Sequence, residues 1–289
     1  MLIDSPQVLQ DRPPHAVDLL VVGGLTVDSF ADGSSAAGGS VVHASRAAWA
    51  AGLRVGIVTL AGDEPEARDG LRELGELAIV HAVRVPASIG FRHHERGGHR
   101  VLVLTERGSP LTCPTRALQP RAVLYAPVAA EIGAGLADQV YPGAATAAIL
   151  QGWLRTLDQG RPVRPTPLAW LHPALVEPLR TFDLLVASRE DLAAVAAEPG
   201  DQLDQLRATF GPRPLLAVTG GPSGAWLDGG DRPRWHVAPE RVITGTPTTG
   251  AGDVFAAILA AQLARGVDPA AAAEAGTAAA VAYLARQPS

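Results

Sequence analysis

Short apolar runs alternate along the chain with longer stretches in which apolar residues recur at helical spacing. Runs bounded by glycine, proline or charged residues predict buried strands. They lie at residues 17–22, 55–60, 78–85, 121–126, 144–150, 182–187 and 214–219. The stretches with helical spacing lie at residues 40–51, 64–74, 190–197, 201–210, 252–265 and 269–285. Strands that alternate with helices predict an α/β fold, with a mostly parallel sheet covered by helices on both faces.

Glycines and capping residues set the expected ends of the first helices. Ser40 is a candidate N-cap of the first helix, and Gly52 is a candidate stop signal. The second helix is expected to end at Gly75. Residues 31–39, which are small and polar, are predicted to be a flexible connection before the first helix.

Two segments have the pattern of β-hairpins. Residues 91–95 and 99–105 flank an Arg-Gly-Gly sequence suited to a tight turn. Charged residues alternate along this hairpin, so we expect it to leave the main core. A second hairpin-like segment covers residues 224–238.

Composition narrows the class of protein. The chain has 289 residues, of which 47% are hydrophobic and 18% charged, which predicts a folded α/β domain rather than disorder. The formal net charge of −5 and the lack of a basic run argue against a nucleic-acid partner. Cys113 is the one cysteine, so no internal disulfide is possible. No signal-peptide pattern and no membrane-spanning apolar stretch is present, so the expected location is the cytoplasm.

All 24 basic residues are arginine, because the chain contains no lysine. A Walker A loop needs a lysine on the phosphates, and the protein-kinase pattern needs a lysine on a strand. Schiff-base catalysis needs a lysine as well. These three classes of enzyme are therefore excluded.

The strongest local signal is the sequence Thr-Thr-Gly-Ala-Gly-Asp at residues 248–253, which leads directly into a predicted helix. Glycines allow the backbone to approach a ligand closely, and the first amides of a helix attract anions. A carboxylate at Asp253 could accept a proton from an attacking hydroxyl at that site. Taken alone, so short a motif is more often an ordinary turn followed by an aspartate that the helix dipole favours.

Four segments in order resemble ribokinase-like carbohydrate kinases of the PfkB type. Residues 248–253 resemble the C-terminal signature of that family, and residues 23–28 resemble the end of its first strand. Residues 38–44 resemble its N-terminal glycine-pair signature, and residues 218–224 resemble its nucleotide-side turn. The resemblance runs over nearly the whole chain. It implies a three-layer ribokinase-like α/β fold in a single domain, residues 1–289, with a small β lid formed mainly by residues 84–105.

The resemblance also implies roles for individual residues. Asp253 would be the catalytic base, and the backbone of Gly250, Ala251 and Gly252 would form the anion hole. Residues expected to bind the substrate are Asp28, Gly38, Gly39 and His43. Residues expected to bind the nucleotide are Thr219, Gly221, Gly224, Ser188 and Asp191. ATP and Mg²⁺ are the implied cofactors, and no protein metal cluster is expected because the nucleotide phosphates and water would hold the Mg²⁺.

The sequence departs from the family pattern at several of these positions. Pro247 replaces the aspartate that helps relatives to bind an activating monovalent cation, so no potassium requirement is expected. His43 replaces an asparagine that binds substrate in relatives. A histidine can donate and accept hydrogen bonds, so His43 could still bind substrate. The alternative is that it only makes hydrogen bonds within the protein, as a helix residue. Ser40 replaces the lysine of ribokinase, which argues against ribose. Ser188 and Asp191 replace the asparagine and glutamate of a magnesium-linked motif, and an ordinary helix cap explains them as well.

Two further segments resemble a subgroup that includes inositol kinases and some nucleoside kinases. They are residues 126–128 with Glu131, and residues 151–155, and both follow predicted strands. Ligand crevices form at the ends of strands in open α/β sheets. Arg155 either meets a phosphate there or is simply solvated.

The expected activity is phosphoryl transfer from ATP to a hydroxyl of a small sugar, polyol or nucleoside. A non-catalytic binding protein is the alternative, motivated by Pro247, His43 and Ser188. A dinucleotide-binding oxidoreductase ranks last, because residues 23–28 lack the GxGxxG pattern. The sequence leaves the substrate open, and it leaves both a monomer and a homodimer open.

Overall fold

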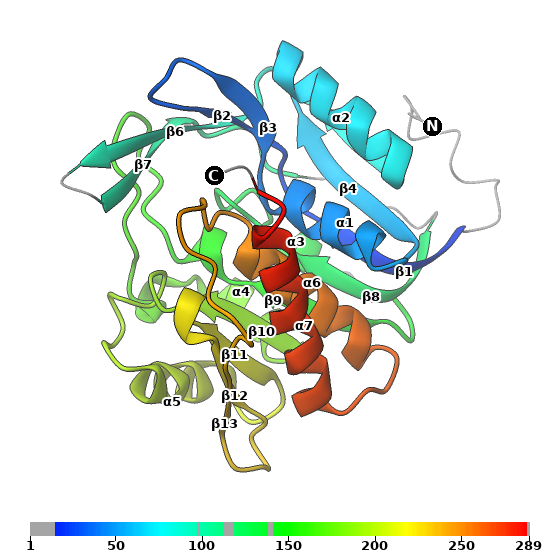
Figure 1. Cartoon of the computed structure of the whole chain (residues 1–289), viewed down its shortest axis with the longest axis vertical. Coiled ribbons are helices and arrows are strands. Elements are labelled where there is room, and N and C mark those ends of the chain that lie inside the picture. Colours follow the sequence, from blue (N-terminus) through cyan, green and yellow to red (C-terminus); the bar gives the residue numbers. More distant parts are fainter. Residues whose placement is uncertain (1–14, 97–98, 112–117, 138–140, 288–289) are drawn as a thin grey trace.

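The computed structural model describes residues 15–96, 99–111, 118–137 and 141–287. Within them, nine strands form one sheet (Figure 1). In spatial order these are β13 (Trp235–Val237), β12 (Ala225–Asp228), β11 (Leu215–Thr219), β10 (Leu184–Ser188), β9 (Ala145–Ile149), β8 (Leu118–Tyr125), β1 (His15–Val22), β4 (Val55–Ala61) and β5 (Ile79–Arg84). The seven strands from β11 to β5 are parallel, and β12 and β13 extend the sheet as an antiparallel hairpin. The predicted mostly parallel sheet is confirmed.

The direction of winding reverses beside β1. The chain passes from β1 to β4 and β5 on one side, and later returns to place β8 on the other side of β1. Val22 is paired with Val58 of β4 and with Tyr125 of β8, so the carboxyl ends of these strands lie together. A reversal of this kind opens a crevice at the carboxyl edge of a parallel sheet.

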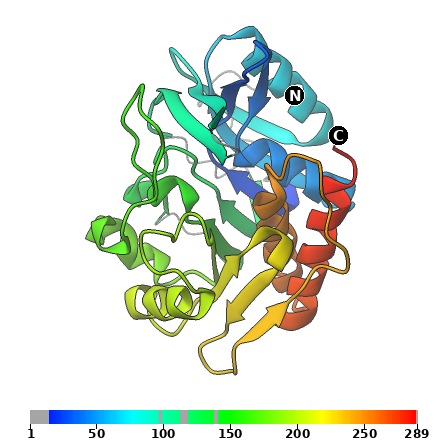
Figure 2. The ribbon, with the colours of Figure 1, turned by 60° about the vertical axis from the view of Figure 1, so that its left-hand side comes forward.

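Helices cover both faces of the sheet because each strand is apolar on both sides (Figures 1 and 2). One core cluster joins Leu19 and Val21 of β1 to α1 (Ser40–Ala50), α2 (Pro65–Leu77), α6 (Ala251–Leu263) and α7 (Pro269–Leu284). The other joins Leu20 and Val22 to α4 (Pro173–Leu179) and α5 (Pro199–Phe210), and α3 (Ala134–Ala137) packs against α4. Alternate residues of β1 therefore pack into two separate hydrophobic cores, one on each face of the sheet.

A second sheet stands away from the main body. Its spatial order is β3 (Ser35–Gly38), β2 (Thr26–Ser29), β6 (Ile89–Arg96) and β7 (His99–Glu106) (Figure 1). The predicted hairpin is present as β6 and β7, while its turn at residues 97–98 lies outside the described residues. The prediction of a flexible connection at residues 31–39 is wrong for residues 35–38, because β3 pairs with β2.

Three further local predictions differ from the structure. Ser40 is the first residue of α1 rather than its N-cap, which is Gly39 with φ 93°. Helix α2 continues past Gly75 to Leu77, because one glycine costs an exposed helix only about 1 kcal/mol. Residues 190–197 form turns instead of a helix. The side-chain amide of Gln202 donates to carbonyl oxygens within and beside that segment, which stabilises the turns.

Candidate active site

Asp253 lies in the first turn of α6. Gly250 is the N-cap of this helix and has a left-handed backbone with φ 86°, which favours glycine. The helix is anchored by an almost continuous buried run from Val254 onward. The amides of Gly252 and Asp253 occupy the first turn, where helical N–H groups have no carbonyl partner four residues earlier. The Ala251 amide donates to the carbonyl oxygen of Thr248 at 3.3 Å. The sequence therefore places a carboxylate and the positive end of a helix at one point.

His43 of α1 packs directly against the start of α6. A Cβ atom added to Gly250 would lie 2.5 Å from His43 Cγ, so only glycine fits at this position. The hydroxyl of Tyr283, near the end of α7, forms a 2.8 Å hydrogen bond with His43 Nδ1. Helices α1 and α7, which are far apart in the sequence, thus meet at the histidine, and both pack against α6 (Figure 1).

Burial raises the pKa of the Asp253 carboxyl above its usual 3.8. The His43 imidazole, the Ser40 hydroxyl and the Arg155 guanidinium oppose this rise, while the negative charge of Asp191 adds to it. The pKa of Tyr283 is also raised, first by burial and then by Asp253. These groups form one electrostatically linked cluster around the candidate base.

Asp28 lies on β2 of the second sheet, and 9% of its surface is exposed. The Thr26 hydroxyl donates a 2.9 Å hydrogen bond to Asp28 Oδ1, and His93 Nε2 of β6 lies 3.3 Å from Asp28 Oδ2. The ring of Phe30 packs on His93 at 4.9 Å between centroids. The carboxylate is therefore held by neighbours on two strands, with an aromatic side chain beside it.

The glycine pair connects the Asp28 region with the Asp253 region. A Cβ atom on Gly38 would lie 2.6 Å from Asp28 Oδ2, and one on Gly39 would lie 2.7 Å from the carbonyl oxygen of Gly24. The next residue, Ser40, starts α1 and influences Asp253. The close approach of the Asp28 and Thr26 side chains to Gly38, and of the Gly24 backbone to Gly39, explains why both positions are glycine.

Glu131 links the end of β1 to the end of β8, where the direction of winding reverses. Its carboxylate accepts hydrogen bonds from the backbone amides of Gly24, Val128 and Ala129, at 2.7 to 3.1 Å. The side chain is buried, and burial raises its pKa while the amide hydrogen bonds oppose that rise. Glu131 therefore fixes the loops after β1 and β8 relative to one another.

The predicted nucleotide-side turn follows β11. Gly221 has φ 56° and Gly224 has φ 83°, and a Cβ atom on Gly224 would lie 2.1 Å from the carbonyl oxygen of Val237. A Cβ atom on Gly252 would lie 3.9 Å from the Thr219 hydroxyl. The end of β11 thus faces the start of α6, which brings Thr219 to the side of the anion site.

Ser188 and Asp191 bond to one another rather than standing free. The Ser188 hydroxyl donates to Asp191 Oδ2 at 2.6 Å, and the Asp191 amide donates back to the hydroxyl at 3.0 Å. Arg155 donates to Asp191 Oδ1 through Nε at 3.0 Å and lies 2.9 Å from it through Nη2. Residue 188 is paired with Thr219 across β10 and β11, so this group also lies at the carboxyl edge of the sheet.

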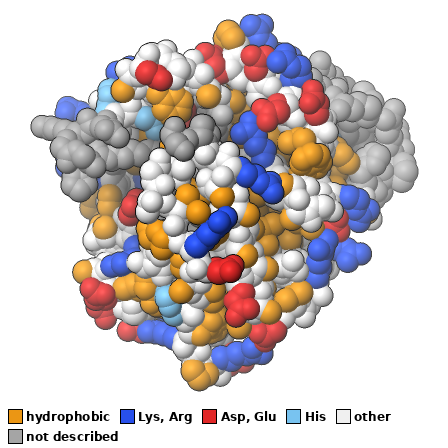
Figure 3. All heavy atoms as spheres, in the orientation of Figure 1, with side chains coloured by type: hydrophobic (Ala, Val, Ile, Leu, Met, Phe, Trp, Pro, Cys, Tyr) orange, Lys and Arg blue, Asp and Glu red, His pale blue; other side chains and the backbone are white. Residues whose placement is uncertain are grey.

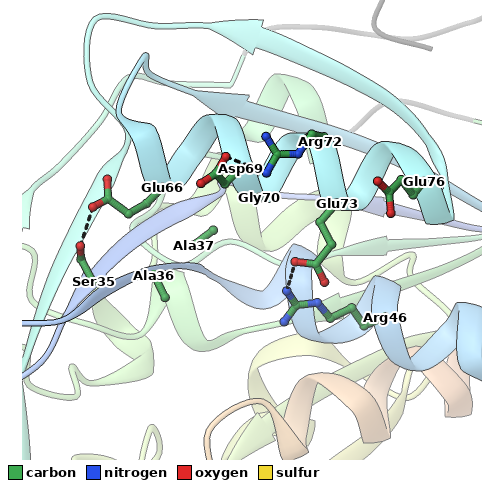
Figure 4. Close-up of a pocket in the computed structure, with 10 residues that line it drawn as sticks. All are labelled: Ser35, Ala36, Ala37, Arg46, Glu66, Asp69, Gly70, Arg72, Glu73 and Glu76. Carbon is green, nitrogen blue, oxygen red and sulfur yellow. Dashed lines mark hydrogen bonds and ion pairs between the residues drawn. The ribbon is translucent and has the colours of Figure 1, made fainter.

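A separate surface groove of about 510 Å³ lies between β3, α1 and α2. Two pairs of its lining side chains join different elements (Figure 4): Ser35 of β3 with Glu66 of α2, and Arg46 of α1 with Glu73 of α2. Arg72 pairs with Asp69 along α2 itself. None of the predicted site residues lines this groove. Over the face of the molecule in Figure 3, acidic and basic side chains are interspersed. No helix among the described residues is long and apolar enough to cross a membrane.

The residues that the sequence singled out lie along one edge of the main sheet and the adjoining second sheet. Asp253, His43 and Ser40 meet at the start of α6, and Asp28 lies with Gly38. Two contacts were missed by sequence reasoning. They are the contact of Tyr283 with His43 and that of His93 with Asp28. The signal for Tyr283 was a hydroxyl group in an otherwise alanine-rich helix. The signal for His93 was its place on the same strand face as the buried Phe91.

Comparisons with known proteins agree with this fold. Residues 138–287, just over half of the chain, match the model of the pfkB family of carbohydrate kinases. No curated protein sequence matches the chain. Many solved structures are similar in fold, and three of them serve as examples. A pyrophosphate-dependent kinase in the ribokinase family, complexed with a pyrophosphate analog and myo-inositol, has a TM-score of 0.74 and 17% identity, over 94% of this chain and 96% of that chain.

The other two structures are ribokinases. A ribokinase of Arabidopsis thaliana complexed with ribose and ATP has a TM-score of 0.69 and 16% identity, over 93% of this chain and 92% of that chain. A ribokinase from Thermotoga maritima has a TM-score of 0.69 and 15% identity, over 93% of this chain and 93% of that chain. At these identities the likeness establishes the three-layer fold alone.

Proposed function

Because the chain belongs to the pfkB family of carbohydrate kinases, we propose that it transfers the γ-phosphate of ATP to a hydroxyl of a small sugar, a polyol such as inositol, or a nucleoside. The observation that carries this proposal is the position of Asp253. A carboxylate with a raised pKa stands at the N-terminus of α6, beside His43 and at the carboxyl edge of a parallel sheet. A base and an anion site are what phosphoryl transfer to an alcohol requires.

The proposed reaction uses both sheets. Asp28 binds a hydroxyl of the acceptor, and Asp253 accepts the proton of the reacting hydroxyl as its oxygen attacks the γ-phosphorus. The bond between that phosphorus and the β–γ bridging oxygen breaks, and ADP leaves with the electron pair. The backbone amides of Gly250, Gly252 and Asp253 stabilise the negative charge on the transferring group, and the Ala251 amide joins them once it releases the Thr248 carbonyl oxygen. His43, Gly38 and Gly39 border the acceptor.

The donor side of the proposal consists of Thr219, Gly221 and Gly224, with Ser188 and Asp191 next to them. Among the described residues, no group of three His, Cys, Asp or Glu side chains is arranged to hold a metal. As the resemblance to ribokinase-like kinases implies, the proposal places Mg²⁺ on the donor phosphates and water, where it would neutralise phosphate charge. Pro247 has no side-chain ligand to offer, so the proposed activity needs no monovalent cation.

We treat residues 1–289 as one kinase domain whose lid is the second sheet. Residues 84–105 supply β6 and most of β7, and the segment from Thr26 to Gly38 supplies the other two strands. Because Asp28 belongs to this sheet, movement of the sheet would bring the acceptor toward Asp253 and exclude water.

ADP release measured with Mg²⁺ and ATP against a panel of inositols, pentoses, hexoses and nucleosides tests the proposal. We expect one class of acceptor to stimulate ADP release, and Asp253→Asn to reduce turnover about 10²-fold or more. Asp268→Asn is the matched control, because Asp268 caps α7 at an exposed position and asparagine caps a helix equally well. Full activity of Asp253→Asn would overturn the assignment of the base.

The alternative is a protein that binds such a compound without turning it over. Its signature is a ligand-induced rise in melting temperature with no ADP release from any acceptor of the panel. The same panel, followed by thermal unfolding, therefore separates a kinase from a binding protein.

A further inference from the structure

Arg155 stands at the carboxyl edge of the main sheet, directly after β9. The chain leaves β9 through a short 3₁₀ turn (Gln151–Trp153), and the backbone of Arg155 bridges to Pro165. Leu154 is buried and its carbonyl oxygen accepts from Thr166. The backbone on both sides of Arg155 is thus fixed, so the guanidinium extends from a rigid part of the chain.

One edge of the guanidinium is held by a buried carboxylate. Nε and Nη2 both lie within 3.0 Å of Asp191 Oδ1, while the Ser188 hydroxyl occupies Oδ2. The Asp191 side chain is 4% exposed and that of Arg155 is 19% exposed. Among the described residues, no hydrogen bond from Nη1 occurs, so the other edge of the fork is available to a ligand.

The positive charge of Arg155 reaches the catalytic centre, where it acts on the Asp253 carboxyl. The other arginines near this edge are engaged elsewhere. Arg46 is paired with Glu73 of α2, and Arg189 lies over the ring of Trp226 at 5.7 Å and donates to a backbone carbonyl.

The phosphates of the donor require a positively charged side chain beside them. The phosphates of ATP or pyrophosphate carry several negative charges, and a helix N-terminus supplies only about half of one positive charge. The chain has no lysine, so a fixed side-chain cation must be an arginine. A guanidinium held along one edge presents its remaining N–H groups to phosphate oxygens in a fixed direction.

We propose that Arg155 binds the terminal phosphate of the phosphoryl donor and neutralises its charge during transfer, with Asp191 and Ser188 acting as positioning residues that orient it. This inference rests on the proposed kinase function. The step adds no reactant. The acceptor oxygen forms a bond to the transferring phosphorus as Asp253 takes its proton, the donor P–O bond breaks, and the leaving phosphate keeps the electron pair, while Arg155 contacts oxygens of the transferring group.

The competing explanation is that Arg155 only neutralises the buried charge of Asp191. A double-mutant cycle of Arg155→Gln, Asp191→Asn and the double variant separates the two. The readouts are the dissociation constants of ATP and of pyrophosphate, kcat, and the KM of donor and acceptor separately. Pyrophosphate is included because it tests the phosphate contact without a nucleoside.

We expect Arg155→Gln to weaken donor binding and to lower kcat/KM for the donor about 10²-fold, as loss of one charge-stabilising donor does in other enzymes. The KM of the acceptor should change little. Asp191→Asn alone should also weaken donor binding, because it releases Arg155 from its fixed orientation, and a smaller loss should remain when Arg155→Gln is made in that background. Normal donor binding by both Asp191→Asn and the double variant would overturn the proposal, and so would unchanged donor binding by Arg155→Gln.

Arg207→Gln is the matched control. Arg207 forms an ion pair of similar burial with Asp228, with side chains 18% and 7% exposed, near the opposite end of β11. Its loss should lower the melting temperature and leave the donor KM unchanged. A comparable change in donor KM in this control would overturn the specific role of Arg155.

Donor binding also separates this inference from the proposed function. If the wild-type protein binds ATP or pyrophosphate through Arg155 but phosphorylates no acceptor, the phosphate contact stands and the kinase proposal fails. If neither ATP nor pyrophosphate binds to the wild-type protein, the phosphate contact itself is overturned.

Discussion

Asp253 and Asp268 are both aspartates at the start of a helix, yet their carboxyl groups behave in opposite ways. Asp268 is exposed, pairs with Arg232 and caps α7 by accepting from the Ala270 amide, and these contacts lower its pKa. Asp253 is partly buried, and burial raises its pKa. The residue type is the same, so the environment alone makes one a cap and the other a candidate base.

The raised pKa of Asp253 predicts an acid limb in the pH profile. The base must be ionised, so kcat/KM for the acceptor should fall as the pH drops through the pKa of Asp253, at a pH above the usual 3.8. The Ser40 hydroxyl lowers this pKa, so Ser40→Ala should move the limb to higher pH. Profiles of the wild type and the variant test this, and a limb that stays in place would contradict it.

At the scale of elements, the start of α6 depends on how closely α1 approaches it. Gly250 combines a left-handed backbone with the contact to the His43 ring. The sequence motif predicts an anion site here, but the histidine that packs on the glycine comes from a distant helix. The close packing of α1, α6 and α7 brings these residues together.

Gly250→Ala should lower the free energy of unfolding by about 1–3 kcal/mol through backbone strain, with a further loss from the clash with His43. Gly52→Ala is the control, because Gly52 has φ 79° and no atom within 4 Å of an added Cβ atom. Urea denaturation of both variants compares strain with and without the clash. Equal destabilisation of the two would show that the His43 contact contributes nothing.

The second sheet shows where prediction from local pattern fails. The hairpin of β6 and β7 has alternating residues and a glycine turn, and the sequence predicts it. Residues 35–38 are small and have no alternation, so nothing local indicates a strand. They become β3 because β2 pairs with them on one side and with β6 on the other.

At the scale of the whole molecule, Glu131 links the two halves of the main sheet. Its carboxylate accepts from Gly24 after β1 and from Val128 and Ala129 after β8, at the point where the winding reverses. Backbone amides turned toward a buried crevice need acceptors. One side chain supplies these acceptors for segments that lie far apart in the sequence.

Glu131→Gln should lower the free energy of unfolding by about 1–3 kcal/mol, because an amide group would leave at least one buried N–H without an acceptor. Glu76→Gln is the control on the exposed surface of α2, where we expect a change within about 0.5 kcal/mol. Urea denaturation measures both. Equal stability of Glu131→Gln and the wild type would contradict the proposed link between the strand ends.

The sequence by itself determined the parallel sheet, most of the helices and the glycine-rich start of α6 with Asp253. These features depend on local signals: apolar runs of strand length, helical spacing, and glycines where the backbone turns. Its resemblance to ribokinase-like carbohydrate kinases also indicated Asp28, His43 and Thr219 as candidate site residues.

Only the tertiary structure decided which side chains meet. The pairs Arg155 with Asp191, His43 with Tyr283, and Asp28 with His93 join residues that are far apart in the sequence. No periodicity records such contacts, because they depend on strand order and on how closely the helices pack. The raised pKa of Asp253 has the same origin, since burial is a property of the assembled fold and not of the motif.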